Sequence, residues 1–199
     1  MAVTSENIQT ARCFAPVYDK NSKVLLLGTV PSFDSVKFGF YYMNKANYFW
    51  RLLSDVTDRD FISLADNVRK KLSDANAKSA VNELIALLLD CKIALFDTIA
   101  ECERVGSTDD KILSSTLNDA KKITEIIKNS SIKKIFCTSG EALRNLVRIF
   151  GGKVCAEKSL SLITGSEDVP FDKLLSPSRR ARQTYFERLS DWQKLKKYL

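Results

Sequence analysis

Residues 23–28 read Lys-Val-Leu-Leu-Leu-Gly, a short run of apolar side chains that stops at Gly28. An uninterrupted run of this length is typical of a strand covered on both faces, as in a parallel sheet under helices. Later runs fit the same pattern at 92–96, 133–137 and 173–175, and a further candidate strand lies at 160–163. Strands that alternate with helical segments predict right-handed crossovers and a mainly parallel sheet of about four strands in an α/β domain.

Between these runs, apolar residues recur at helical spacing and predict helices that cover the sheet. The expected helices span about 45–58, most of 61–90, 119–129, 141–150 and 179–198. The segments expected to lack such helices are an extended lead-in at 1–22, a loop at 29–42, and a short helical turn followed by loop at 98–118. We expect a single domain over residues 1–199, because this length suits one domain and the 7 Gly and 4 Pro leave little room for a linker.

The composition excludes several kinds of catalytic site. Histidine is absent, which excludes Ser-His-Asp triads, His-based acid–base catalysis and His metal ligands. Five scattered cysteines form no CxxC pair, so they give little support to a zinc or iron–sulfur site and are expected to be reduced thiols. The N-terminus lacks a signal-peptide pattern, and the longest apolar run, Leu84–Leu89, is far shorter than the ~20 residues that span a bilayer. We therefore expect a soluble intracellular protein without a membrane partner.

The charge balance favours a polyanionic partner. The chain has 31 Lys and Arg against 24 Asp and Glu, a formal net charge of +7. Residues 176–199 alone hold seven basic and two acidic side chains, so most of the excess lies in this C-terminal segment. Nucleic acid is the most plausible partner for such a segment, although charge alone does not single it out.

The predicted sheet places four polar segments at one edge. In parallel α/β folds, ligands bind at the carboxyl ends of the strands. Those ends are Gly28 and the loop after it, Asp97, Thr138–Ser139, and the turn that starts at Ser176. We therefore expect these segments to converge on one cleft.

Each segment has a functional and a purely structural interpretation. The turn after Gly28 can face a ligand with its backbone, or its aromatic residues can simply cover the core. Asp97 can accept hydrogen bonds from a ligand, or it can cap a helical turn at Thr98. The turn Ser176-Pro-Ser-Arg-Arg180 can bind phosphate at a helix start, or Ser178 can be an N-cap beside solvated arginines.

Three longer segments carry a resemblance to a known family. They are LLLGTVPSFDSVKFGFYYMNKANYFWRLL at 25–53, IALFDTIAECERVGSTDDKI at 93–112 and LLSPSRRARQTYFERLSDWQKL at 174–195. In this order and spacing they resemble the DNA-deoxyinosine (hypoxanthine-DNA) glycosylase family of the uracil-DNA glycosylase superfamily. The resemblance implies a three-layer α/β/α sandwich, uracil-DNA glycosylase-like, with a central mainly parallel four-stranded sheet. It also implies double-stranded DNA with a damaged base as substrate, no metal or organic cofactor, and a monomer.

The resemblance also assigns roles to individual positions. Val30 lies where most branches of the superfamily hold a catalytic Asp or Asn, and the asparagine that substitutes for it in this family is here Asn47. Asp97 lies where related branches keep an Asn that reads the base edge, and it either accepts a hydrogen bond from the purine or polarises water. Ser176 lies where relatives often hold His or Asn, and Arg180 where they place an apolar wedge.

The remaining expected contacts are with the base and the DNA backbone. Phe33 is expected to form an aromatic platform for the flipped base, with Tyr41 or Tyr42 nearby, and Val30 is expected to line the same site. The expected contacts to phosphates and groove are Ser32, Ser176, Ser178, Arg179 and Arg180.

Together these observations predict a monofunctional DNA glycosylase of base-excision repair that hydrolyses the N-glycosidic bond of hypoxanthine. A uracil- or mismatch-specific glycosylase is the nearest alternative. A non-catalytic DNA-binding module is the other, because Val30 and Ser176 are inert where relatives hold catalytic side chains. The expected location is the cytoplasm, or the nucleus in a eukaryote.

Overall fold

The computed structural model describes residues 8–70, 77–105, 112–151 and 169–199 of the chain. Its centre is a four-stranded parallel sheet in the order β3-β2-β6-β7. The strands are β2 (Val24–Gly28), β3 (Ile93–Asp97), β6 (Lys134–Cys137) and β7 (Phe171–Lys173). Each lies within two residues of a predicted run, so the predicted parallel sheet is confirmed. The candidate strand at 160–163 falls outside the described residues.

Strand β2 lies inside the sheet and is buried along its whole length. Val24 and Leu26 pack into the apolar core on one face of the sheet, whereas Leu25 and Leu27 pack into the core on the other face. Because successive side chains of a strand point to opposite faces, a strand between two cores needs apolar residues at every position. This is the physical reason that residues 24–27 show no polar alternation.

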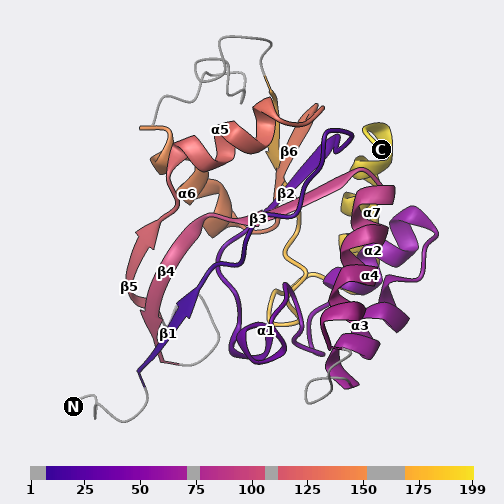
Figure 1. Ribbon diagram of the computed structural model, residues 1–199, viewed down its shortest axis with the longest axis horizontal. Coiled ribbons are helices and arrows are strands. Elements are labelled where there is room, and N and C mark those ends of the chain that lie inside the picture. The colour runs from indigo at the N-terminus through magenta and orange to yellow at the C-terminus, as the bar shows by residue number, and fades with distance from the viewer. Residues whose placement is uncertain (1–7, 71–76, 106–111, 152–168) are drawn as a thin grey trace.

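Helices cover both faces of this sheet and give the molecule three layers (Figure 1). One face is covered by α2 (Phe49–Thr57), α3 (Phe61–Lys70), α4 (Ala77–Asp90), α7 (Tyr185–Trp192) and the 3₁₀ helix η3 (Gln193–Lys197). The other face is covered by α5 (Ala120–Lys128) and α6 (Gly140–Ile149). The predicted α/β/α sandwich is therefore confirmed, and these helices lie within the predicted segments or one residue outside them.

A second sheet that the sequence did not predict continues directly from β3. Here β4 (Ile99–Arg104) pairs in antiparallel fashion with β1 (Gln9–Arg12) and β5 (Ile112–Leu117). The expected helical turn after Asp97 was wrong, and so was the interpretation of Asp97 as its cap. The chain stays extended because the amides of Thr98 and Ile99 donate to the carbonyls of Gly28 and Thr29, each at 2.9 Å.

A short helix replaces part of the loop expected at 29–42. Helix α1 (Phe33–Phe38) follows Ser32, whose hydroxyl accepts a hydrogen bond from the amide of Ser35 at 3.2 Å. An N-cap serine satisfies one of the amides that a helix start leaves without an intrahelical partner. Ser32 is thus a helix cap as well as a residue near the end of β2.

The last helix begins later than predicted. It starts at Tyr185 rather than at 179, and its N-cap is Thr184 rather than Ser178. Thr184 and Glu187 form a capping box, in which the Thr184 hydroxyl accepts from the Glu187 amide and the Thr184 amide donates to the Glu187 carboxylate. These hydrogen bonds lower the pKa of Glu187.

The described cysteines are free thiols. Cys102 and Cys137 are buried, Cys13 and Cys91 are half-buried, and Cys155 falls outside the described residues. Burial raises the pKa of Cys137 to about 12, so this thiol stays protonated at neutral pH. Within the described ranges, no helix combines the length and the apolar character needed to cross a membrane.

The capping box makes a prediction about stability. Thr184→Ala removes the hydroxyl that accepts the Glu187 amide and should lower the free energy of unfolding by about 1 kcal/mol. Urea denaturation followed by circular dichroism measures the change, and Thr184→Ser should restore most of it. Ser190→Ala, at an exposed position of the same helix, is the matched control and should change little. An equal loss of stability in Thr184→Ala and Ser190→Ala would contradict the role of Thr184 as the N-cap.

Candidate functional site

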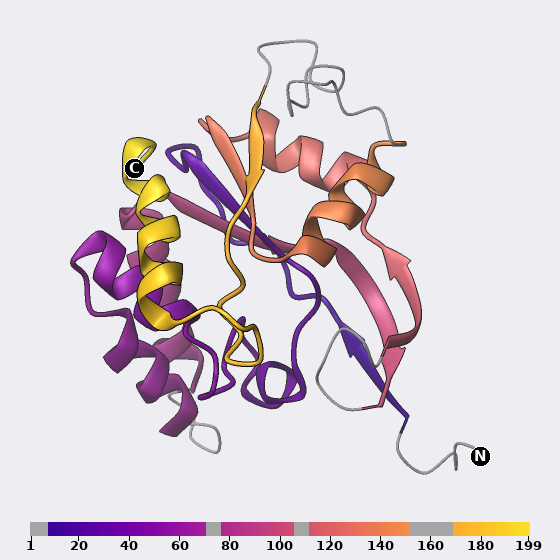
Figure 2. The ribbon, with the colours of Figure 1, turned by 180° about the vertical axis from the view of Figure 1, so that it is seen from behind.

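A cleft of about 590 Å³ opens at the carboxyl ends of β2, β3 and β6. The segment that follows β7 closes its other side, and Figure 2 shows this segment between α1 and the start of α7. Nine of the predicted site residues line the cleft: Val30, Ser32, Tyr42, Asn47, Asp97, Ser176, Ser178, Arg179 and Arg180. Residues from four separate segments are therefore brought together, as the strand topology predicted.

The floor of the cleft is built where β2 and β3 end. Gly28 and Asp97 are paired in the parallel register, and a Cβ atom on Gly28 would lie 2.3 Å from Asp97 Oδ1 and 2.7 Å from Tyr42 Oη. Only a glycine allows both side chains to approach the strand so closely. The carboxyl of Asp97 is 3% exposed, so it lies at the bottom of the cleft rather than at its rim.

Tyr42 is fixed beside this carboxyl by two contacts. Its ring stacks on Phe49 with centroids 3.7 Å apart, and its hydroxyl shares a hydrogen bond of 2.8 Å with Thr138 Oγ1. Its backbone has φ of 54°, a left-handed conformation that is unfavourable for a residue with a side chain. Such strain persists only where surrounding contacts enforce it, and it is common at functional sites.

Tyr41 lines the same cleft and donates to the carbonyls of Phe14 and Ala15 at 3.2 and 3.1 Å. Burial, and to a lesser degree the nearby charge of Asp97, raise the pKa of Tyr41 well above its usual value. The Tyr41 hydroxyl therefore stays protonated at neutral pH and cannot act as a general base.

Asn47 is attached directly to the Ser-Pro-Ser turn. Its backbone forms an isolated antiparallel bridge with Ser178, and the neighbouring amide of Tyr48 donates to the Pro177 carbonyl at 2.9 Å. The side-chain oxygen of Asn47 accepts from the Phe49 amide at 2.9 Å. The amide NH₂ of Asn47 is then the end of the side chain that can serve a ligand or a water molecule.

Arg188 of α7 holds the segment 176–183 in place. Its guanidinium is 2% exposed and donates to the carbonyls of Ser176, Ser178, Ala181 and Gln183. These hydrogen bonds hold the segment in an irregular conformation, and the helix predicted from 179 begins only at 185. A buried charge is tolerated here because its donors are satisfied by backbone oxygens.

Arg104 of β4 holds the loop after β2 in a similar way, on the opposite side of the cleft. Its guanidinium is 1% exposed, donates to the carbonyl of Pro31, and lies 5.0 Å from the centroid of the Phe33 ring. Phe33 is not among the residues that line the cleft, and its role as a platform for the flipped base stays a prediction. As the first residue of α1, it turns its ring toward Arg104 instead.

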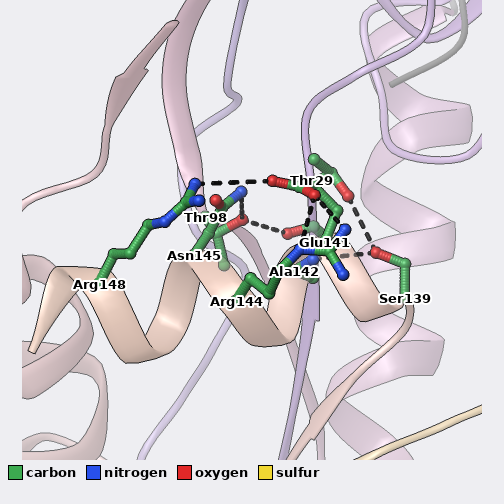
Figure 3. Close-up of polar contacts among 9 residues, drawn as sticks. Thr29, Thr98, Ser139, Glu141, Ala142, Arg144, Asn145 and Arg148 are labelled. Atoms are coloured by element: carbon green, nitrogen blue, oxygen red, sulfur yellow. Dashed lines mark hydrogen bonds and ion pairs between the residues drawn. The ribbon is translucent and has the colours of Figure 1, made fainter. Parts of the chain in front are cut away.

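The start of α6 completes the cleft wall (Figure 3). Ser139 is the N-cap of this helix, accepts from the Ala142 amide at 3.0 Å and shares a hydrogen bond of 3.1 Å with Thr29. Behind it, Asn145 donates to Thr98 Oγ1 at 3.3 Å. These contacts link β2, β3 and α6 and orient the hydroxyls that face the cleft.

The sequence patterns did not single out Arg104 or Arg188 as residues of the site, although the position of each one in its helix or strand indicates burial. Arg188 falls on the apolar stripe of its helix, three residues after Tyr185 and four before Trp192. A charged side chain on the buried stripe of a helix needs a specific partner, which indicates hydrogen bonds to backbone carbonyls or an ion pair. Arg104 lies at a buried position of a strand that was itself not predicted.

The chemistry available in the cleft is therefore restricted. Among its lining residues Asp97 is the sole carboxylate, and hydroxyls, amides and backbone groups supply the remaining polar contacts apart from Arg179 and Arg180. The described part of the chain has no group of three or more Cys, Asp or Glu side chains placed to hold a metal ion. Such a site can position a water molecule, accept a hydrogen bond from a ligand and neutralise an anion at its rim.

Comparison with known proteins gives related sequences and a related fold. No protein-family model matches the chain. Two curated proteins named hypoxanthine DNA glycosylase are similar to it. The one from Methanosarcina acetivorans is 28% identical over 129 residues, which are 65% of this chain and 70% of that protein. The one from Methanosarcina barkeri is 30% identical over 116 residues, which are 58% and 64% of the two chains.

A solved structure shares the fold. The solution NMR structure of a proposed uracil DNA glycosylase from Methanosarcina acetivorans matches with a TM-score of 0.64 and 24% identity. The match covers 94% of this chain and 96% of the other. The α/β/α arrangement described above is therefore the fold of that protein also.

The buried guanidinium of Arg188 leads to a prediction about the 176–183 segment. Arg188→Met fills a similar space but removes the side-chain donor to four carbonyls, and it should lower the free energy of unfolding by roughly 3 kcal/mol. Urea denaturation measures this loss, and limited trypsin digestion should cut faster after Arg179, Arg180 or Arg182. Arg182→Met, an exposed neighbour, is the control. If Arg188→Met has an unchanged free energy of unfolding and an unchanged rate of digestion, Arg188 does not hold the segment 176–183 in place.

The close packing at Gly28 leads to a second prediction. Gly28→Ala should displace Asp97 and Tyr42 and lower the free energy of unfolding by about 1–3 kcal/mol, the usual effect of overpacking. Gly140→Ala is the matched control, since its Cβ would meet only Arg144 Nη1 at an ordinary 3.6 Å. Thermal unfolding of the two variants tests the difference, and a Gly28→Ala protein as stable as Gly140→Ala would refute it.

Proposed function

We propose that this chain, which belongs to the hypoxanthine-DNA glycosylase family of the uracil-DNA glycosylase superfamily, hydrolyses the N-glycosidic bond of hypoxanthine in double-stranded DNA. The observation that carries the proposal is the meeting of Asn47 and Asp97, from segments 50 residues apart, in one cleft beside two arginines. The names of the two curated relatives supply the substrate class.

The dimensions and charges of the cleft suit a nucleotide that has left the duplex. A volume of about 590 Å³ lies in the range of small-molecule sites, roughly 300–1,000 Å³. Arg179 and Arg180 are exposed on the turn that closes the cleft and can contact phosphates on either side of the flipped nucleotide. Flipping an inosine is favourable relative to a well-paired base, because weak pairing lowers the unstacking cost.

In this proposal Asp97, at the floor of the cleft, recognises the base. Hypoxanthine carries a hydrogen on N1 and an oxygen at C6, whereas adenine has a lone pair on N1 and an amino group at C6. A carboxyl oxygen of Asp97 can accept from N1–H. Because Tyr42 and Thr138 share one hydrogen bond, one of their two hydroxyls can donate to O6. Buried polar groups discriminate strongly, since a base that leaves them without hydrogen bonds binds poorly.

Bond cleavage in this proposal is a direct hydrolysis. Water adds its oxygen to C1′ of the sugar while the bond from C1′ to N9 breaks, and the released hypoxanthine takes up the proton that water loses. Asn47 orients the water through its amide, and hydroxyl and backbone donors of the cleft stabilise negative charge on the departing base. The sugar develops oxocarbenium character in the transition state, as in other glycosidic hydrolyses.

Replacing Asn47 tests its assigned role. Asn47→Ala should lower the single-turnover rate of hypoxanthine release about 10²–10³-fold, the typical effect of removing one orienting or stabilising group. The abasic product is measured by alkaline cleavage of a labelled inosine duplex, and stability is checked by urea denaturation. Asn129→Ala, at an exposed position after α5, is the matched control. Near-wild-type release by folded Asn47→Ala would refute the assignment.

A panel of duplexes separates the proposed function from its alternatives. The wild-type protein should release the base from I:T duplexes much faster than from U:G, U:A or T:G. Preferred release of uracil or of a mismatched base would identify the other kind of glycosylase. Binding of duplex DNA without an abasic product on any of these substrates would identify a non-catalytic module and overturn the proposal.

A further inference from the structure

An aromatic side chain on α7 is exposed to an unusual degree. Phe186 is 79% exposed, whereas the other exposed large apolar side chains of the described residues range from 41% for Ile62 to 55% for Leu113. A single exposed apolar residue is ordinary on a protein surface and carries no functional meaning by itself. What distinguishes Phe186 is the set of side chains around it.

Phe186 is the outer end of a row of three rings that starts beside the cleft. The ring centroids of Phe186 and Tyr185 are 6.0 Å apart, and those of Tyr185 and Tyr48 are 5.1 Å apart. Tyr48 follows Asn47 in the chain, and its amide is bonded to the Pro177 carbonyl of the cleft turn. We call Tyr48, Tyr185 and Phe186 the aromatic strip.

Two exposed arginines lie on the rings of this strip. The guanidinium carbon of Arg179 is 4.8 Å from the centroid of Tyr48, and that of Arg51 is 4.2 Å from the centroid of Tyr185. Stacking on a ring uses the face of a guanidinium and leaves its N–H edges available for hydrogen bonds. Both cations are thus held at the surface in positions suited to phosphate.

The acidic side chains near the strip are already engaged. Asp55, one turn after Arg51 on α2, accepts a hydrogen bond from the Tyr185 hydroxyl. Glu187, next to Phe186, accepts from the amide and the hydroxyl of Thr184. None of the ion pairs within the described residues involves Arg51 or Arg179, so both can interact with an external anion.

We propose that the aromatic strip is a second DNA-binding site, in which Phe186 stacks on an unpaired base of the DNA next to the flipped nucleotide while Arg51 and Arg179 bind the adjoining phosphates. The proposal rests on the proposed function in taking DNA as the partner. Aromatic rings interleaved with cations are the surface that binds single-stranded nucleic acid without sequence preference, because every base has a face on which a ring can stack.

The stacking role of Phe186 is tested with undamaged DNA, so that the result does not depend on catalysis. A short fluorescent thymidine oligonucleotide is titrated with protein and Kd is measured by anisotropy. Phe186→Ala should raise Kd about 5- to 100-fold, the range found when a stacking ring is replaced by alanine. Phe186→Trp should bind as well as wild type, and Leu113→Ala, the control for a lost exposed apolar side chain, should leave Kd unchanged.

The phosphate role of Arg51 is tested by the salt dependence of the same titration. Arg51→Ala should lower the slope of log Kd against log salt concentration by about 0.7, which corresponds to one lost phosphate contact on a single strand. Lys128→Ala on α5, on the opposite face of the sheet, should leave the slope unchanged.

The position of the strip is tested with duplexes that carry inosine and are shortened one nucleotide at a time from either end. As the duplex is shortened from one end, the affinity of the wild-type protein should drop sharply at one length, and shortening from the other end should give no such drop. The Phe186→Ala protein should show no sharp drop from either end. A wild-type and a Phe186→Ala protein that lose affinity in parallel on both sides would overturn the proposal.

Three other outcomes would also overturn it: an unchanged Kd in Phe186→Ala, an equal loss in Leu113→Ala, or a Phe186-dependent change of oligomeric state without any change in DNA affinity. The last would identify the strip as a contact between copies of the chain. The two proposals can fail separately. If the proposed function is wrong, DNA binding will depend on Phe186 but no base will be released. If the proposal for the aromatic strip is wrong, the protein will release the base and Phe186→Ala will bind DNA with unaltered affinity.

Discussion

Two buried guanidinium groups hold the loops between which the cleft lies. Arg104 reaches from β4 to the carbonyl of Pro31, and Arg188 reaches from α7 to four carbonyls of the segment 176–183. Neither loop has enough regular structure to satisfy its own backbone, and a planar cation with five donors can bind several carbonyls at once. The position of Asn47 depends on this arrangement too, because its backbone pairs with Ser178.

The absence of histidine shapes the chemistry of the proposed reaction. With Val30 after the end of β2, the cleft offers one carboxyl near its floor, neutral donors around it and two arginines at its rim. Such a site can orient water and stabilise charge, and it does so without an imidazole. Reactivity would then depend strongly on the leaving group, and hypoxanthine leaves more readily than adenine because its anion is better stabilised.

Local patterns predicted the parallel sheet, its helices and the convergence of strand ends, because continuous apolar runs and helical spacing are properties of short segments. The second sheet was not predictable in this way, since β1 and β4 are about 90 residues apart and β4 buries its side chains without regular alternation. The contact of the Phe33 ring with Arg104 was not predictable for a similar reason, because it joins distant segments. Arg188 was overlooked because arginines are usually exposed.

Strand β2 also constrains how the length of the chain can change. Its register sets Gly28 opposite Asp97 and, in the same five residues, divides four apolar side chains between two cores. Insertion or deletion of one residue within 24–28 would exchange the two sets of side chains and move the glycine away from the carboxyl. The strand therefore accepts exchanges between apolar residues at 24–27, but it accepts neither a side chain at 28 nor a change in length.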